Sequence, residues 1–150
     1  MTTEGTRPSL HTVLAHFPLI VWGASFVFDV VSFFGGAPFV EAALFNVVAG
    51  LVAMAAASVT DARDYFARLP PASAARRFAR WHALANVVAT ALFIASLSLR
   101  WSARGAVATP LWPFVLSGLG VATLGVASYL GGLVDYEYAA TTRRQSPDVH

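Results

Sequence analysis

LHTVLAHFPLIVWGASFVFDVVSFF, the stretch from residue 10 to residue 34, holds a single acidic side chain, Asp29, in an otherwise strongly apolar run. A helix of this length extends for about 37 Å, which is enough to cross the ~30 Å hydrocarbon core of a bilayer. Pro18 and Asp29 interrupt the run, and no small-residue cleavage site follows it, so it does not resemble a signal peptide. The stretch therefore predicts a transmembrane helix that stays in the protein.

Three further apolar runs of similar length follow, at residues 39–59, 81–99 and 111–134. The whole chain is 57% hydrophobic and 12% charged, whereas about a quarter of the residues of a soluble domain are charged. The runs lack the alternation of barrel strands, so helices are the expected way to satisfy their backbone in lipid. We predict an all-α, four-transmembrane-helix antiparallel bundle over residues 1–138, followed by a polar tail at 139–150.

Arginine is distributed unequally between the two sides of this predicted bundle. The side that carries both termini and the loop between the second and third helices has Arg7, Arg63, Arg68, Arg76, Arg77, Arg80, Arg143 and Arg144. The opposite side has Arg100 and Arg104. Positive charge in short loops marks the cytoplasmic side, so we expect both termini to be cytoplasmic. The net charge of +2 reflects this bias and gives no reason to expect a nucleic-acid partner.

Small residues recur at helical spacing along the fourth run. They are Gly118, Ala122, Gly125 and Gly132. Small side chains let helix backbones approach closely in membranes, where no hydrophobic drive brings helices together. We expect this stripe to pack closely against another helix. A contact inside the bundle is favoured, and contact with another subunit is the alternative.

Most side chains that are costly in lipid lie where the helices begin or end on the cytoplasmic side. They are His11, His16, Asp61, Arg80, His82, Asn86 and Asp135. His82 and Asn86 are four residues apart and share a helix face. In an antiparallel bundle the first and third helices begin on the same side, so His16 could face His82 across the core. The pattern predicts a polar cluster at this end.

Asp29 does not belong to this cluster, because it lies late in the first helix, near the opposite membrane face. Arg100, at the far end of the third helix, lies at a similar depth. Ionisable side chains within membranes usually pair with one another. We predict that Asp29 and Arg100 form a structural ion pair.

The absence of cysteine limits the available chemistry. The chain can form no disulfide, no covalent c-type haem and no iron–sulfur cluster on cysteine ligands. It also lacks a phosphate-binding glycine loop and the motifs of zinc proteases and serine hydrolases. We therefore expect that the protein is not an enzyme.

The opening LHTVLAHFPLI resembles the L-H-P-x-x-V-H-F-P-I motif of a family of small bacterial four-helix membrane proteins of unknown function. Asp29, Asp61, the Arg80-x-His82 pair with Asn86, and the closing GGLVDYEY at residues 131–138 are also similar to that family's pattern. The resemblance implies an integral protein of the bacterial inner membrane. Some members resemble the membrane part of proteins with a Rieske-type iron–sulfur domain, which implies a redox membrane.

Three functions remain open. The first is a non-catalytic accessory subunit of a larger respiratory or photosynthetic electron-transfer complex, with membrane proteins and lipid as partners. The second is a protein that binds b-type haem, with His16 and His82 as axial ligands and Arg80 near the propionates. The third is a proton or ion path through His16, Asp61, His82 and Asp135.

Overall fold

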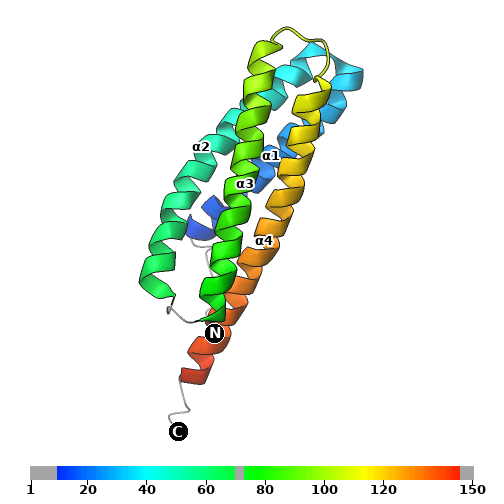
Figure 1. The fold of residues 1–150 in the computed structure, drawn as a ribbon. Helices are drawn as coiled ribbons and strands as arrows, with labels where there is room; N and C mark the ends of the chain where they lie inside the picture. The colour runs from blue at the N-terminus through cyan, green and yellow to red at the C-terminus, as the bar shows by residue number, and fades with distance from the viewer. Residues whose placement is uncertain (1–9, 70–72, 146–150) are drawn as a thin grey trace, which may run out of the picture.

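Four helices run up and down along a single bundle in the computed structural model, which describes residues 10–69 and 73–145 (Figure 1). They are α1 (Leu10–Gly35), α2 (Ala37–Arg68), α3 (Ala74–Ser102) and α4 (Leu111–Gln145). No strand occurs among the described residues, and the expected all-α four-helix architecture is confirmed. The main packing is α1 on α2 and α3 on α4, and the two pairs are joined by α1 against α4 and α2 against α3.

The helices extend beyond the apolar runs that predicted them. The run ending at Val59 lies in a helix that ends at Arg68, and the run beginning at Trp81 lies in a helix that begins at Ala74. α4 continues to Gln145, so most of the predicted tail at 139–150 is helical, while 146–150 lies outside the described residues. Apolar patterning marks the part of a helix that lies in lipid, whereas alanine and arginine continue a helix equally well in polar surroundings.

A single residue, Gly36, connects α1 to α2. Its φ of 78° lies in the region that L side chains rarely adopt, so glycine is required there. The Gly36 N–H donates to the carbonyl oxygen of Ser32 at 3.1 Å, and the Gly36 carbonyl accepts from the N–H of Phe39 at 3.1 Å. A proline in the first turn then starts α2 without losing a helix hydrogen bond. The reversal between the first two helices is therefore very tight.

Trp22 of α1 lies at the centre of the core and is fully buried. Its indole ring stacks on Phe93 of α3, with ring centroids 4.1 Å apart, and its Nε1 donates to the carbonyl oxygen of Val47 on α2 at 3.1 Å. Two glycines make room for these rings, since a Cβ on Gly50 would overlap Trp22 and a Cβ on Gly120 would lie 2.6 Å from Phe93. The side chain of Trp22 thus connects α1 with both α2 and α3.

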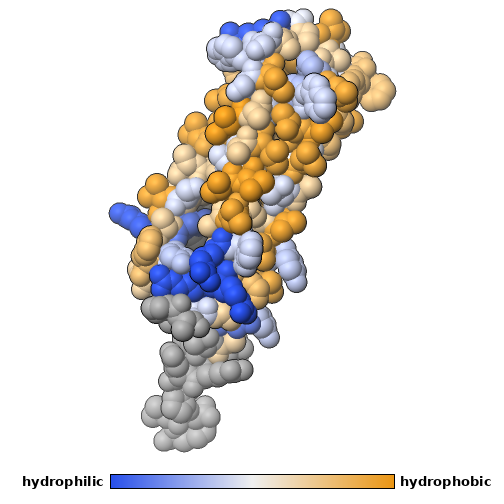
Figure 2. Space-filling model, viewed as in Figure 1, coloured by the Kyte–Doolittle hydropathy of each residue, from blue (hydrophilic) through white to orange (hydrophobic). Residues whose placement is uncertain are grey.

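Large apolar side chains cover the outside of the bundle, as expected of a protein whose solvent is lipid. Phe34 is 90% exposed and Phe45 is 71% exposed, and many other apolar side chains are more than half exposed. Figure 2 shows apolar residues over the length of the bundle and polar residues gathered near its two ends. All four helices are long and apolar enough to span a membrane.

The expectation that the small-residue stripe of α4 packs inside the bundle is wrong for most of the stripe. Ala122, Gly125 and Gly132 are exposed, and a Cβ on either glycine would meet nothing within 4 Å. Gly118 alone approaches another helix, because a Cβ there would lie 3.1 Å from Phe26 of α1. The buried face of α4 has the same spacing of residues as the small-residue stripe, but it is shifted by one position along the sequence. A shift of one residue turns the face by about 100° around the helix axis. The buried face contains Pro113, Ser117, Gly120, Leu124 and Ala127.

Candidate functional site

The first polar centre surrounds Asp29, whose side chain is fully buried near the end of α1. Arg100 of α3 is 4% exposed, and its Nη2 is in direct contact with one carboxylate oxygen of Asp29. The hydroxyl of Thr109, in the connection between α3 and α4, donates to the other carboxylate oxygen at 2.9 Å. Both oxygens of the buried acid therefore have a donor, as a buried charge requires.

Serine side chains surround this ion pair. Arg100 donates from Nε to the hydroxyl of Ser96 at 3.2 Å and from Nη2 to that of Ser117 at 3.0 Å. The backbone N–H of Thr109 donates to the hydroxyl of Ser32 at 3.0 Å. These six residues form what we call the Asp29 cluster, which links α1, α3, α4 and the connection between the last two. Its members are Asp29, Ser32, Ser96, Arg100, Thr109 and Ser117.

The Asp29 cluster is buried throughout, and its opposite charges neutralise each other. Arg100 Nη1 is its one buried side-chain atom without a hydrogen-bond partner among the described residues. A buried ion pair of this kind holds its helices in register, because separating the two groups would leave a charge unpaired in an apolar interior. The arrangement is that of a structural tie.

The second polar centre lies at the end of the bundle where α1 and α3 begin, which we call the His82 end. The imidazole of His82 is 25% exposed and joins three helices. Its Nδ1 lies 2.7 Å from the carbonyl oxygen of Ala127 on α4, and its Nε2 lies 3.0 Å from Nδ2 of Asn86. Asp61 of α2 completes what we call the His82 cluster, with Oδ2 at 3.6 Å from Nε2.

The hydrogen-bond partners of His82 indicate which of its two ring nitrogens carries a hydrogen. A backbone carbonyl only accepts, so Nδ1 carries a hydrogen and donates to Ala127. In the neutral ring Nε2 is then the acceptor, and the amide of Asn86 donates to it. In the charged ring Nε2 is a second donor, and the carboxylate of Asp61 is the nearby acceptor. Nε2 of His82 therefore has a nearby partner in either form, the amide of Asn86 in the neutral ring and the carboxylate of Asp61 in the charged ring.

The predicted polar cluster is brought together only in part. Asp61, His82 and Asn86 are in contact, and Asp135 lies near enough to interact electrostatically with His82. The side chains of Asp135, His16 and Arg80 are exposed. His11 falls in α1, but its side chain lies outside the described part of the structure. Among the described residues, no three or more potential metal-binding side chains lie close enough together to hold a metal ion.

Several groups that complete these two centres could not be identified from the sequence. Thr109 lies in a connection, and nothing in the local pattern places it against a helix on the other side of the bundle. The Ala127 carbonyl is a backbone group and has no sequence signature. Gly131 belongs to the closing motif, but nothing in that motif indicates that a Cβ there would lie 3.3 Å from the His82 ring. Among the residues of the two centres that were not predicted, Ser96 could have been found most easily, because it lies one helical turn before Arg100 on the same helix face.

The fold and these interior polar ties define a predicted integral membrane protein with four candidate spans. Residues 7–144 match the family model described as "Predicted membrane protein (DUF2231)", and the chain belongs to that family. The comparison with curated proteins and the comparison with solved structures each found no match.

Proposed function

We propose that the protein is a non-catalytic accessory subunit of a larger membrane assembly. The observation that carries the proposal is the Asp29 cluster, in which the deeply buried charges of Asp29 and Arg100 pair with each other. A membrane protein that moves or transforms a substrate usually keeps intramembrane charges facing a watery cavity or a cofactor. Here the buried charges instead stabilise the scaffold, as in a protein whose task is to present a surface.

The surface that fits a partner is the small-residue stripe of α4. Ala122, Gly125 and Gly132 face outward, and the two glycines leave open space above the helix. Small residues in a lipid-facing position gain little from lipid contact but allow a second helix to approach closely. This supports a transmembrane helix of another subunit as the occupant of the stripe.

We place the protein in a bacterial inner membrane with the His82 end on the cytoplasmic side. Arg63, Arg77 and Arg80 are exposed at that end, whereas at the opposite end Arg104 is exposed and Arg100 is buried in its ion pair. Positive charge in short loops marks the cytoplasmic side, so the excess of arginine at the His82 end supports this orientation. A respiratory or photosynthetic electron-transfer complex is proposed from the resemblance noted for the opening motif.

The proposal is tested by purifying the tagged protein from its native membrane in mild detergent. We expect other membrane subunits in fixed stoichiometry, and we expect Gly125→Leu to abolish their co-purification while leaving the helix content unchanged. Gly23→Leu is the matched control, because a Cβ on Gly23 of α1 also meets nothing within 4 Å. Recovery of the protein without stoichiometric partners, or equal losses in the two variants, would refute the proposal.

A proton path is the second candidate, and the His82 cluster favours it. Its imidazole lies between a carboxylate and a backbone carbonyl, and both His82 and Asp61 are partly exposed, at 25% and 35%. Proton relays in membranes use such pairs. Proton flux into vesicles that is lost in Asp61→Asn or Asp135→Asn, and kept in Glu41→Gln at an exposed position of α2 near the opposite end, would support this candidate over the first, and absence of flux above that of empty vesicles would remove it.

The haem alternative receives less support from the geometry. The bond from His82 Nδ1 to a backbone carbonyl is typical of a metal-ligating histidine. However, Nε2 is the nitrogen that would bind iron, and it faces the Asn86 amide. An absorption spectrum of the purified protein with a Soret band, lost in His82→Ala, would reinstate this alternative.

A further inference from the structure

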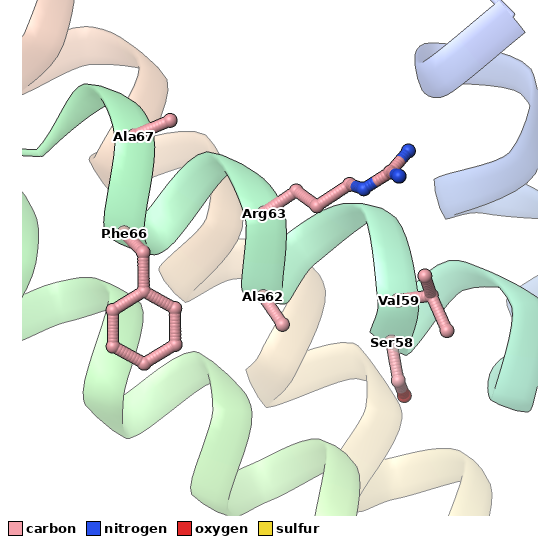
Figure 3. Close-up of a pocket in the computed structure, with 6 residues that line it drawn as sticks. All are labelled: Ser58, Val59, Ala62, Arg63, Phe66 and Ala67. Carbon is pink, nitrogen blue, oxygen red and sulfur yellow. The ribbon is translucent and has the colours of Figure 1, made fainter.

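A shallow hollow lies on the outer face of α2, close to the His82 end (Figure 3). Two rows of side chains, each with members four residues apart, form its lining. Figure 3 shows the two rows projecting to different sides of the helix. One row is Ser58, Ala62 and Phe66, and the other is Val59, Arg63 and Ala67.

The hollow extends from the hydrocarbon level of the bilayer to the headgroup level. The apolar run of α2 ends at Val59, and Arg63 follows one helical turn later, about 6 Å further along the helix axis. Headgroups add about 5–7 Å to each side of the hydrocarbon core. Arg63 therefore lies at the depth of lipid phosphates, while Val59 lies at the depth where acyl chains begin. Phe66 is 78% exposed and suits the interface, where aromatic rings gather.

The charge of the hollow is positive among the six residues that line it. None of the six lining residues is acidic, and the nearby carboxylate of Asp61 is directed to His82 instead. Arg63 forms no ion pair among the described residues. By contrast, Arg76 lies over the ring of Tyr65 at 4.6 Å, and Arg77 lies over the ring of Phe78 at 5.8 Å. The guanidinium of Arg63 is thus exposed and available to an external anion.

We propose that this hollow binds an anionic phospholipid. The lipid phosphate contacts the guanidinium of Arg63, and one acyl chain follows Val59 and Ala62 toward the bilayer centre. The small side chain of Ala62 leaves the space that the upper part of the lipid occupies. A basic group beside an apolar depression at the membrane surface is the combination that recognises acidic lipid headgroups.

Native mass spectrometry of the detergent-solubilised protein, titrated with phosphatidylglycerol or phosphatidylcholine, tests the proposal. We expect phosphatidylglycerol to bind first and more tightly, and Arg63→Gln to weaken its binding by about fivefold, the usual effect of one arginine at a membrane surface. Arg77→Gln is the matched control, since it removes the same charge from an exposed position on α3. Equal weakening by both variants would overturn the proposal, because it would indicate binding to overall charge.

A second pair of variants separates the shape of the hollow from its charge. Ala62→Leu fills the depression and keeps Arg63, and we expect it to weaken phosphatidylglycerol binding. Ala91→Leu adds the same bulk to an exposed position of α3 and is expected to leave binding unchanged. Unchanged binding in Ala62→Leu would overturn the proposal. Competition by millimolar inorganic phosphate would also overturn it, since the site would then recognise a free anion rather than a lipid.

Discussion

The Asp29 cluster and the His82 cluster use similar components at opposite ends of the bundle, and they differ mainly in their access to solvent. In both, a basic side chain of α3 meets an acid of another helix. Asp29 and Arg100 are buried and in direct contact, whereas Asp61 and His82 are partly exposed and 3.6 Å apart. Because both members of the first pair are buried, loss of one member alone leaves an unpaired charge in the interior. The members of the second pair are partly exposed, so water can solvate the one that remains.

The largest expected effect is that of removing one partner of the buried pair. Asp29→Ala leaves Arg100 charged and unpaired in the interior, which should destabilise the protein by about 3–5 kcal/mol. Denaturant unfolding in detergent micelles, followed by circular dichroism, measures the change. Asp135→Ala, at an exposed position, is the control and should have no measurable effect. A small loss in Asp29→Ala would mean that water reaches Arg100 and that the two centres do not differ as described.

The next effect concerns the connection between α3 and α4. Thr109→Val keeps the size of the side chain but removes the hydroxyl that donates to Asp29. We expect a loss of about 1–2 kcal/mol, because one oxygen of a buried carboxylate then lacks its donor. The same unfolding experiment measures it. Thr123→Val is the control, since Thr123 is bonded only within its own helix; an equal loss there would assign the effect to helix propensity.

A smaller effect is expected at the His82 end. His82→Ala removes the link between Ala127 and Asp61, but the carboxylate of Asp61 is 35% exposed and remains accessible to water. We expect a loss of about 1 kcal/mol, the usual net value of a hydrogen bond that water can replace. A loss as large as that in Asp29→Ala would erase the distinction between the two clusters.

The smallest effect is expected when the whole buried pair is replaced. Asp29→Leu combined with Arg100→Leu removes both charges together, and such replacements change stability by about 1 kcal/mol or less, or increase it. Recovery of stability relative to Asp29→Ala, measured in the same micelles, would show that the pair acts as one unit. Failure to recover would assign an independent role to the serine and threonine bonds around it.

The number of helices and the Asp29–Arg100 contact could be predicted because hydropathy and depth determine them. Asp29 and Arg100 lie at the same distance from one membrane face, and an antiparallel bundle leaves each with few other partners. Thr109 could not be placed in the same way. Its position against Asp29 depends on the course of a connection, and connections carry no periodicity from which a contact could be deduced.

The orientation of α4 illustrates a second limit of sequence reasoning. Gly118, Ala122 and Gly125 have the spacing of a packed face, and so do Ser117, Gly120 and Leu124. Both faces are rich in small or apolar residues, because a membrane helix is apolar all round. Spacing therefore identified a face suited to close approach, but it could not determine which face turned toward the other three helices.

The one-residue connection at Gly36 constrains how this protein is made. With no spacer between α1 and α2, we expect the two helices to enter the bilayer together, as a hairpin. Lengthening this reversal would then allow the two helices to insert one after the other during synthesis.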